Sequence, residues 1–166
     1  MQDIFTQLIS PSVFPWMGFI LGLCVGSFLN VVIHRLPRMM ENDWRRQCAE
    51  INQSPPPAIE PLSLAKPRSR CPSCGHGITA AENIPVLSWA LLKGRCSACK
   101  APIGLRYPVV ELVAAVSGAF CAWRFGPGLA GWGAMAFVWI IIAASVIDID
   151  TQLLPDAMTQ IGRAHV

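Results

Sequence analysis

Two Cys-x-x-Cys pairs constrain this chain more than any other feature of its sequence. Cys71 and Cys74 form the first pair, Cys96 and Cys99 form the second, and 21 residues separate the pairs. Zn²⁺ binds four thiolates in a tetrahedron, and two such pairs are a recognised spacing for a structural zinc site. A disulfide or redox pair, or four thiols without a role, are the alternatives that the spacing leaves open. We expect residues 66–106 to fold as a small loop domain around one zinc ion, with His76 in solvent because four cysteines complete the shell.

Long apolar stretches on both sides of this loop indicate a membrane protein. Hydrophobic residues make up 53% of the 166 residues and charged residues only 14%, whereas a soluble domain is about one quarter charged. Residues 12–34, 107–124 and 129–147 are the three predicted transmembrane helices. The predicted fold class is therefore an all-α polytopic membrane protein. Its small zinc-binding loop domain, with four cysteines as ligands, lies between helices 1 and 2.

The distribution of charge predicts the topology. Eleven of the thirteen Lys and Arg lie between Arg35 and Arg106, and clustered cations mark a loop as cytoplasmic. The cytosol is reducing, so we expect thiolates on metal rather than disulfides. Residues 1–11 and the turn at 125–128 are then periplasmic, and residues 35–65 are a cytoplasmic linker that begins as Pro37 ends the first helix. Because topology accounts for the bases, we expect no nucleic-acid partner.

Small and polar residues lie along one side of the first predicted helix. Gly18, Gly22 and Gly26 recur every fourth residue, which lets another helix approach closely in lipid. Asn30 and His34 continue the row. Asn30 either hydrogen-bonds across a helix interface, with His34 among the lipid headgroups, or the stretch GSFLNVVIHRLP lines a site at the cytoplasmic edge. Cys24 and Cys121 lie in apolar stretches and are interpreted as small core residues.

Four carboxylates lie where the helices are predicted to meet water. Glu111, in the first turn of the second helix, either pairs with Arg106 or another loop cation or binds a substrate or cofactor. Asp148 and Asp150 end the third helix and point to nearly opposite sides of it. We expect Asp148 to face the bundle, Asp150 to be solvated, and Asp156 to cap a further helix. Catalysis and helix-end solvation both remain open for Asp148.

Five stretches resemble the type IV prepilin peptidases in sequence and order. They are GSFLNVVIHRLP, the two cysteine pairs, ENIPVLSWALLKGRC, RYPVVEL and DIDTQLLPD. Members of that family are aspartyl endopeptidases of the bacterial inner membrane. They remove the leader from type IV prepilins and type II secretion pseudopilins and N-methylate the new terminus with S-adenosylmethionine. The resemblance implies these substrates, contact with membrane lipid, a structural zinc ion and S-adenosylmethionine as methyl donor.

The resemblance places the first catalytic aspartate at Asp148, and Glu111 is a weaker candidate near the methyl donor. The family's second aspartate lies in a Gly-x-Gly-Asp stretch, which these 166 residues do not contain. Two carboxylates must share a proton in such a dyad. We therefore expect residues 148–160 to begin the peptidase region of a truncated, proteolytically inactive chain. Residues 161–166, IGRAHV, match the translation of a common sequencing adapter and are interpreted as a non-native tail. The alternatives are a non-catalytic membrane-anchored zinc-ribbon adaptor and a methyltransferase-only fragment.

Overall fold

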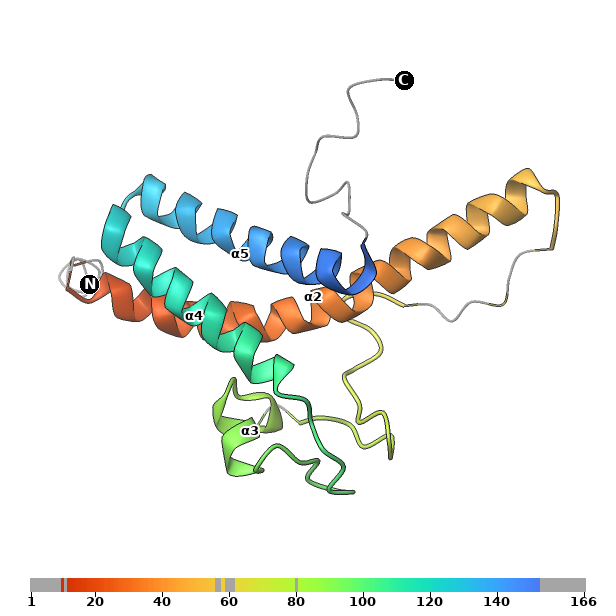
Figure 1. Cartoon of the computed structure of the whole chain (residues 1–166), viewed down its shortest axis with the longest axis horizontal. Helices are drawn as coiled ribbons and strands as arrows, with labels where there is room; N and C mark the ends of the chain where they lie inside the picture. Colours follow the sequence, from red (N-terminus) through yellow and green to blue (C-terminus); the bar gives the residue numbers. More distant parts are fainter. Residues whose placement is uncertain (1–9, 11, 56–57, 59–61, 80, 153–166) are drawn as a thin grey trace, which may run out of the picture.

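Three long helices form the body of the molecule, and a small loop domain lies against one end of it (Figure 1). The computed structural model describes residues 10, 12–55, 58, 62–79 and 81–152. Helices α2 (Phe14–Ile51), α4 (Arg106–Phe125) and α5 (Leu129–Thr151) form the bundle, and the short helices η1 (Ala81–Asn83) and α3 (Leu87–Leu91) belong to the loop domain. The expectations for residues 1–9, Asp156 and the tail at 161–166 lie outside the described residues.

The three bundle helices are each long and apolar enough to cross a membrane. The 20 residues of α4 span about 30 Å at 1.5 Å per residue, which matches the hydrocarbon core. Gly126, with φ of +70°, ends α4 and lets the chain turn into α5, because glycine adopts positive φ without strain. The described residues contain isolated β-bridges but no strand. The all-α membrane fold with an intervening cysteine loop is therefore confirmed.

Pro37 does not end the first helix, and the prediction that it does is wrong. Helix α2 continues through Pro37 to Ile51, so residues 35–51 of the expected linker are helical. Proline removes one backbone hydrogen bond and crowds the preceding turn, but helix-forming residues follow it. Arg45 and Glu41 add an i,i+4 ion pair at 2.5 Å. With 38 residues α2 is about 57 Å long, and its second half projects beyond the bundle (Figure 1).

The glycine row, Gly18, Gly22 and Gly26, is the contact surface of α2 for α4. A Cβ built on Gly22 would lie 2.5 Å from the carbonyl oxygen of Ala114, and one on Gly18 would lie 2.7 Å from that of Gly118. These distances are shorter than van der Waals contact, so only glycine allows the two backbones to touch. The predicted close approach of a second helix is confirmed, and small residues on both helices produce it.

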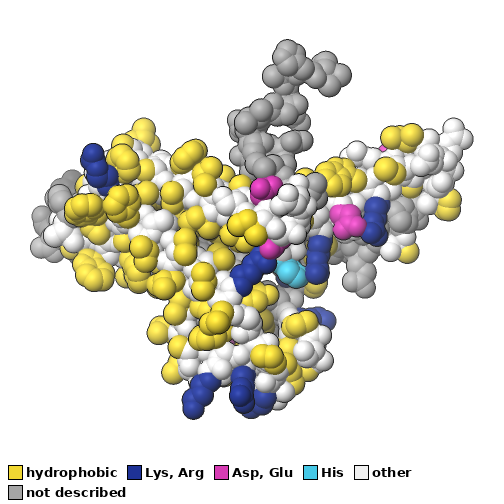
Figure 2. All heavy atoms as spheres, viewed as in Figure 1, with side chains coloured by type: hydrophobic (Ala, Val, Ile, Leu, Met, Phe, Trp, Pro, Cys, Tyr) yellow, Lys and Arg dark blue, Asp and Glu magenta, His cyan; other side chains and the backbone are white. Residues whose placement is uncertain are grey.

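Helix α5 completes the bundle through larger side chains. Phe14, Met135 and Ile147 are fully buried, and the Trp139 indole N–H donates to the Ala114 carbonyl oxygen at 2.9 Å. Figure 2 shows that the visible face of this bundle is largely hydrophobic, as contact with lipid requires.

The two cysteines of the apolar stretches differ in their surroundings. Cys121 is buried in the core, as expected. Cys24 is exposed, because it lies two residues after Gly22 and therefore about 200° around α2 from the α4 contact.

Candidate functional site

The loop domain consists of two similar turns, one for each cysteine pair. An isolated antiparallel bridge closes each turn, Arg70 with Gly77 in the first and Arg95 with Pro102 in the second. The residue after each pair has positive φ, +73° at Gly75 and +60° at Lys100. This repeated geometry reverses the chain tightly and turns both thiols of each pair toward the same point.

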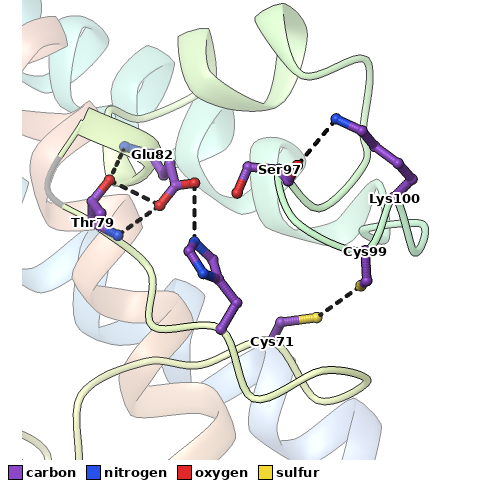
Figure 3. A network of polar contacts seen from close by, with 7 residues as sticks. Cys71, Thr79, Glu82, Ser97, Cys99 and Lys100 are labelled. Atoms are coloured by element: carbon purple, nitrogen blue, oxygen red, sulfur yellow. Dashed lines mark hydrogen bonds and ion pairs between the residues drawn. The ribbon is translucent and has the colours of Figure 1, made fainter.

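The structure brings together the four cysteines that the sequence predicts as metal ligands. Their Sγ atoms all lie within 4.8 Å of one another, and those of Cys71 and Cys99 are 3.8 Å apart (Figure 3). Four sulfurs at the usual Zn–S distance of about 2.3 Å in a tetrahedron are separated by about 3.8 Å. Cys96 is buried and the other three are more accessible. The number, type and spacing of these donors therefore fit zinc.

Backbone N–H groups favour the charged form of the first cysteine in each pair. The N–H of Cys74 lowers the pKa of the Cys71 thiol to about 6, and the N–H of Cys99 similarly lowers the pKa of Cys96. The N–H of His76 favours a Cys74 thiolate, but desolvation and the neighbouring sulfurs outweigh it and raise the Cys74 pKa to about 11. Thiolates this close repel one another, and a shared divalent cation removes that repulsion.

His76 belongs to a network that joins the two turns. Its Nε2 lies 3.4 Å from Oε1 of Glu82, and its side chain is only partly exposed, so the prediction that it lies free in solvent is wrong. Oε2 of Glu82 accepts hydrogen bonds from the N–H and the hydroxyl of Thr79, both at 2.8 Å (Figure 3). Hydrogen bonding from Ser97 and then from Thr79 lowers the Glu82 pKa to about 2. The network therefore lies between the two turns that carry the four cysteines.

A cavity of about 610 Å³ separates the loop domain from the bundle. Residues of α2 between Ser27 and Arg38, both cysteine turns, α3 and the start of α4 line it. Its volume falls within the range of about 300–1,000 Å³ that small-molecule sites occupy. Two buried polar side chains, Asn30 and Glu111, face this cavity, and each is only 8% exposed.

Glu111 does not form the predicted ion pair with Arg106. Its Oε2 accepts the backbone N–H of Val86 at 2.7 Å, while Arg106 pairs with Asp150. Five residues along a helix correspond to a rotation of about 140° from Arg106, so the two side chains point in different directions. Glu111 is instead buried and lines the cavity.

Asn30 both contacts a second helix and lines the cavity. Its Nδ2 donates to the Tyr107 carbonyl oxygen at 3.0 Å, which confirms the predicted hydrogen bond between helices. It also lines the cavity, as do Ser27 and His34 from the same stretch. Arg35, also in this stretch, holds the incoming loop, because its guanidinium donates to the Ser63 and Pro67 carbonyl oxygens at 2.8 and 2.7 Å. Nothing in the local sequence indicated those partners.

The acidic end of α5 lies at the same end of the bundle as the cavity, because Asp150 pairs with Arg106 at the start of α4. Asp150 is exposed, as expected, and the ion pair is an addition to that expectation. Asp148 is half-buried beside the fully buried Ile147 and is not among the residues that line the cavity. Asp148 thus lies outside both the cavity and the cysteine cluster. The ion pair of Arg106 and Asp150 connects its helix, α5, to the start of α4, which lines the cavity.

These features define a membrane-spanning helical bundle with a four-cysteine loop between its first and second spans and an acidic terminus on its third. The chain belongs to the bacterial peptidase A24 N-terminal domain family, which it matches over residues 20–125.

Relatives named prepilin leader peptidase/N-methyltransferase are similar over most of the chain. The protein from Stutzerimonas stutzeri is 49% identical over 150 residues, which are 90% of this chain and 52% of that protein. The protein from Pseudomonas putida is 46% identical over 152 residues, 92% of this chain and 53% of that protein. This chain therefore spans about half the length of the curated relatives it matches. No solved structure matches it.

Proposed function

We propose that this chain provides the N-terminal part of a membrane aspartyl peptidase that removes leaders from type IV prepilins and pseudopilins and then N-methylates the new terminus. We further propose that it lies in the bacterial inner membrane with the loop domain in the cytoplasm. The observation that carries the proposal is the arrangement at one end of the bundle. There the ion pair of Arg106 and Asp150 joins the cavity end of α4 to the helix that carries Asp148.

Asp148 is the proposed catalytic carboxylate of the peptidase. In an aspartyl dyad one carboxylate activates water to attack the peptide carbonyl, and the other protonates the carbonyl oxygen. Asp150 is held by Arg106 and lies about 200° from Asp148 around α5, so it is a poor second member. We propose that the second carboxylate comes from outside the described residues.

The four cysteines are the proposed ligands of a structural zinc ion. Four thiolates fill the tetrahedral shell and leave no open position for water, so the ion would serve as a scaffold. The turns that it organises form one wall of the cavity. Glu111 and the cavity are the proposed surroundings of the methyl donor, S-adenosylmethionine, because a buried carboxylate in a cavity of this size suits a cationic small molecule.

The peptidase assignment can be tested with a fusion of residues 1–152 to the complementary half of the Stutzerimonas stutzeri relative. Leader removal from a prepilin is followed by the mobility shift of the product on a gel. Asp148→Asn should slow cleavage by at least about 100-fold, the scale on which acid–base groups contribute. Asp150→Asn is the matched control and should slow cleavage less than about tenfold, because its ion pair is largely exposed. Equal rates for the two variants would reject Asp148 as the catalytic acid.

Methyltransferase activity without proteolysis is a second candidate. The cysteine cluster and the cavity lie wholly within the described residues, whereas cleavage requires a second carboxylate. The chain is incubated with a pilin peptide that already lacks its leader and with methyl-labelled donor. Transfer of label to the peptide amine would support this function. Absence of label from a zinc-loaded chain would leave the adaptor role or a role that needs the second half.

A further inference from the structure

The lining of the cavity between loop domain and bundle contains a buried acid and several exposed bases. Glu111 and Asn30 are its two buried polar side chains, and we call their side of the cavity the closed end. Arg38, Arg68 and Arg70 also line the cavity but are exposed, and we call their side the open end. None of these three side chains hydrogen-bonds or pairs with a residue that the structure describes, whereas Arg35 is committed to loop carbonyls. Figure 2 shows such basic side chains on the loop domain and where it meets the bundle.

Within the described part of the chain, Glu111 faces the cavity without a cationic partner. Its Oε2 accepts the Val86 N–H, and Arg106 is paired with Asp150. The second carboxylate of the lining, Glu82, is already bound by Thr79 and lies beside His76. Burying a carboxylate is costly unless a counter-charge and hydrogen bonds accompany it. The closed end of the cavity therefore suits a cationic group of a ligand, and the open end suits an anionic group.

We infer that the cavity binds the methyl donor in one orientation, with its sulfonium against Glu111 and its carboxylate against Arg38 and Arg70. This inference rests on the proposed methyltransferase function and assigns the two ends of its donor site. S-adenosylmethionine carries both groups in one molecule, and the cavity volume of about 610 Å³ accommodates a ligand of that class.

The orientation has a consequence for turnover. In the transfer, the amine lone pair forms the new N–CH₃ bond while the S–CH₃ bond breaks and its electrons stay on sulfur. The sulfonium becomes a neutral thioether, and the proton of the amine leaves to water. The attraction of Glu111 therefore acts on the donor and not on the product, S-adenosylhomocysteine. The buried carboxylate favours exchange of spent product for fresh donor.

The test compares ligands that differ in a single charge, using the zinc-loaded chain in lipid nanodiscs and isothermal titration calorimetry. Glu111→Gln should weaken the binding of S-adenosylmethionine at least about tenfold and the binding of S-adenosylhomocysteine less than about threefold. Glu111→Asp, which keeps the charge, should retain part of the preference for the donor. Glu41→Gln is the matched control, because Glu41 is an exposed acid that pairs with Arg45 outside the cavity, and it should change neither affinity.

The open end is tested with the double substitution Arg38→Gln and Arg70→Gln. This double substitution should weaken the binding of S-adenosylmethionine at least about tenfold. It should weaken the binding of decarboxylated S-adenosylmethionine less than about threefold. Arg45→Gln with Arg46→Gln removes the same charge from the part of α2 outside the cavity and should leave both affinities unchanged. Zinc content and far-ultraviolet circular dichroism of each variant confirm that it folds.

The outcomes separate the inference from the function on which it rests. The orientation is overturned if Glu111→Gln weakens the binding of donor and product equally. It is also overturned if the arginine substitutions weaken the binding of donor and decarboxylated donor equally. Either result leaves the methyltransferase assignment standing. Failure of the zinc-loaded wild-type chain to bind S-adenosylmethionine overturns the inference together with the donor site in the proposed function.

Discussion

Replacing Gly22 by alanine tests whether the backbone contact between α2 and α4 holds the bundle together. The added Cβ would lie 2.5 Å from the Ala114 carbonyl oxygen and 2.6 Å from the Ala115 Cα, both backbone atoms that cannot rotate away. Restoring ordinary contact at about 3.4 Å or more requires the helices to separate by about 1 Å. A gap of about 0.5–1 Å removes a quarter to a half of the dispersion energy of each affected contact.

The expected cost of this overpacking is about 1–3 kcal/mol, which is roughly a 5- to 150-fold change in the folding equilibrium. Gly133→Ala is the matched control. Gly133 also lies within a membrane helix, but a Cβ there would meet nothing within 4 Å, so it gains the same helix propensity without a clash.

Both variants are unfolded by titration of sodium dodecyl sulfate into detergent-solubilised protein, followed by tryptophan fluorescence. Gly22→Ala should unfold at lower mole fraction of dodecyl sulfate than Gly133→Ala, and the difference in free energy should equal the packing cost. Equal free energies of unfolding for the two variants would refute the backbone contact as the basis of the bundle.

The same geometry makes three further predictions. The chain should bind one zinc ion, measured by inductively coupled plasma mass spectrometry. Cys96→Ser should reduce the zinc content below a tenth, whereas the control Cys48→Ser should leave it unchanged. Equal zinc content in the two variants would contradict the four-sulfur site. Asn30→Leu, which removes the hydrogen bond to the Tyr107 carbonyl, should lower the free energy of unfolding by about 0.5–1.5 kcal/mol in the dodecyl sulfate titration, and no change would show that the bond contributes nothing. Pro37→Ala should slow amide hydrogen exchange in residues 38–51, because it restores a helical hydrogen bond, and unchanged exchange there would argue against a continuous α2.

Features that depend on local spacing could be predicted without coordinates. Membrane helices need about 20 apolar residues in a row, and three stretches satisfy that requirement. Each cysteine pair occupies its own tight turn, so its two thiols are already close together. The four cysteines therefore meet once the two turns approach each other. The contact of α2 with α4 could be predicted because glycine at every fourth residue leaves one side of a helix flat.

Features that depend on a choice among distant partners could not be predicted in the same way. Arg106 had acids available on its own helix and on α5, and the rotation of α4 in the bundle gives it Asp150 rather than Glu111. The sequence gives no sign that His76 has a partner, because only the folded loop brings its Nε2 within 3.4 Å of the Glu82 carboxylate. Pro37 favours a helix end locally, but the residues after it support a helix strongly enough to continue.

Composition and residue periodicity thus account for the membrane bundle, the position of its metal-binding loop and the presence of acids at its edge, since each depends on interactions within a few residues. The roles of those acids depend on folding in three dimensions. Packing α2 against α4 rotates Glu111 into a cavity, and bringing α5 beside them sets Asp150 on Arg106 and leaves Asp148 without that partner. Charges separated by tens of residues acquire partners only when the helices are assembled, because electrostatic interaction depends on distance in space and on burial.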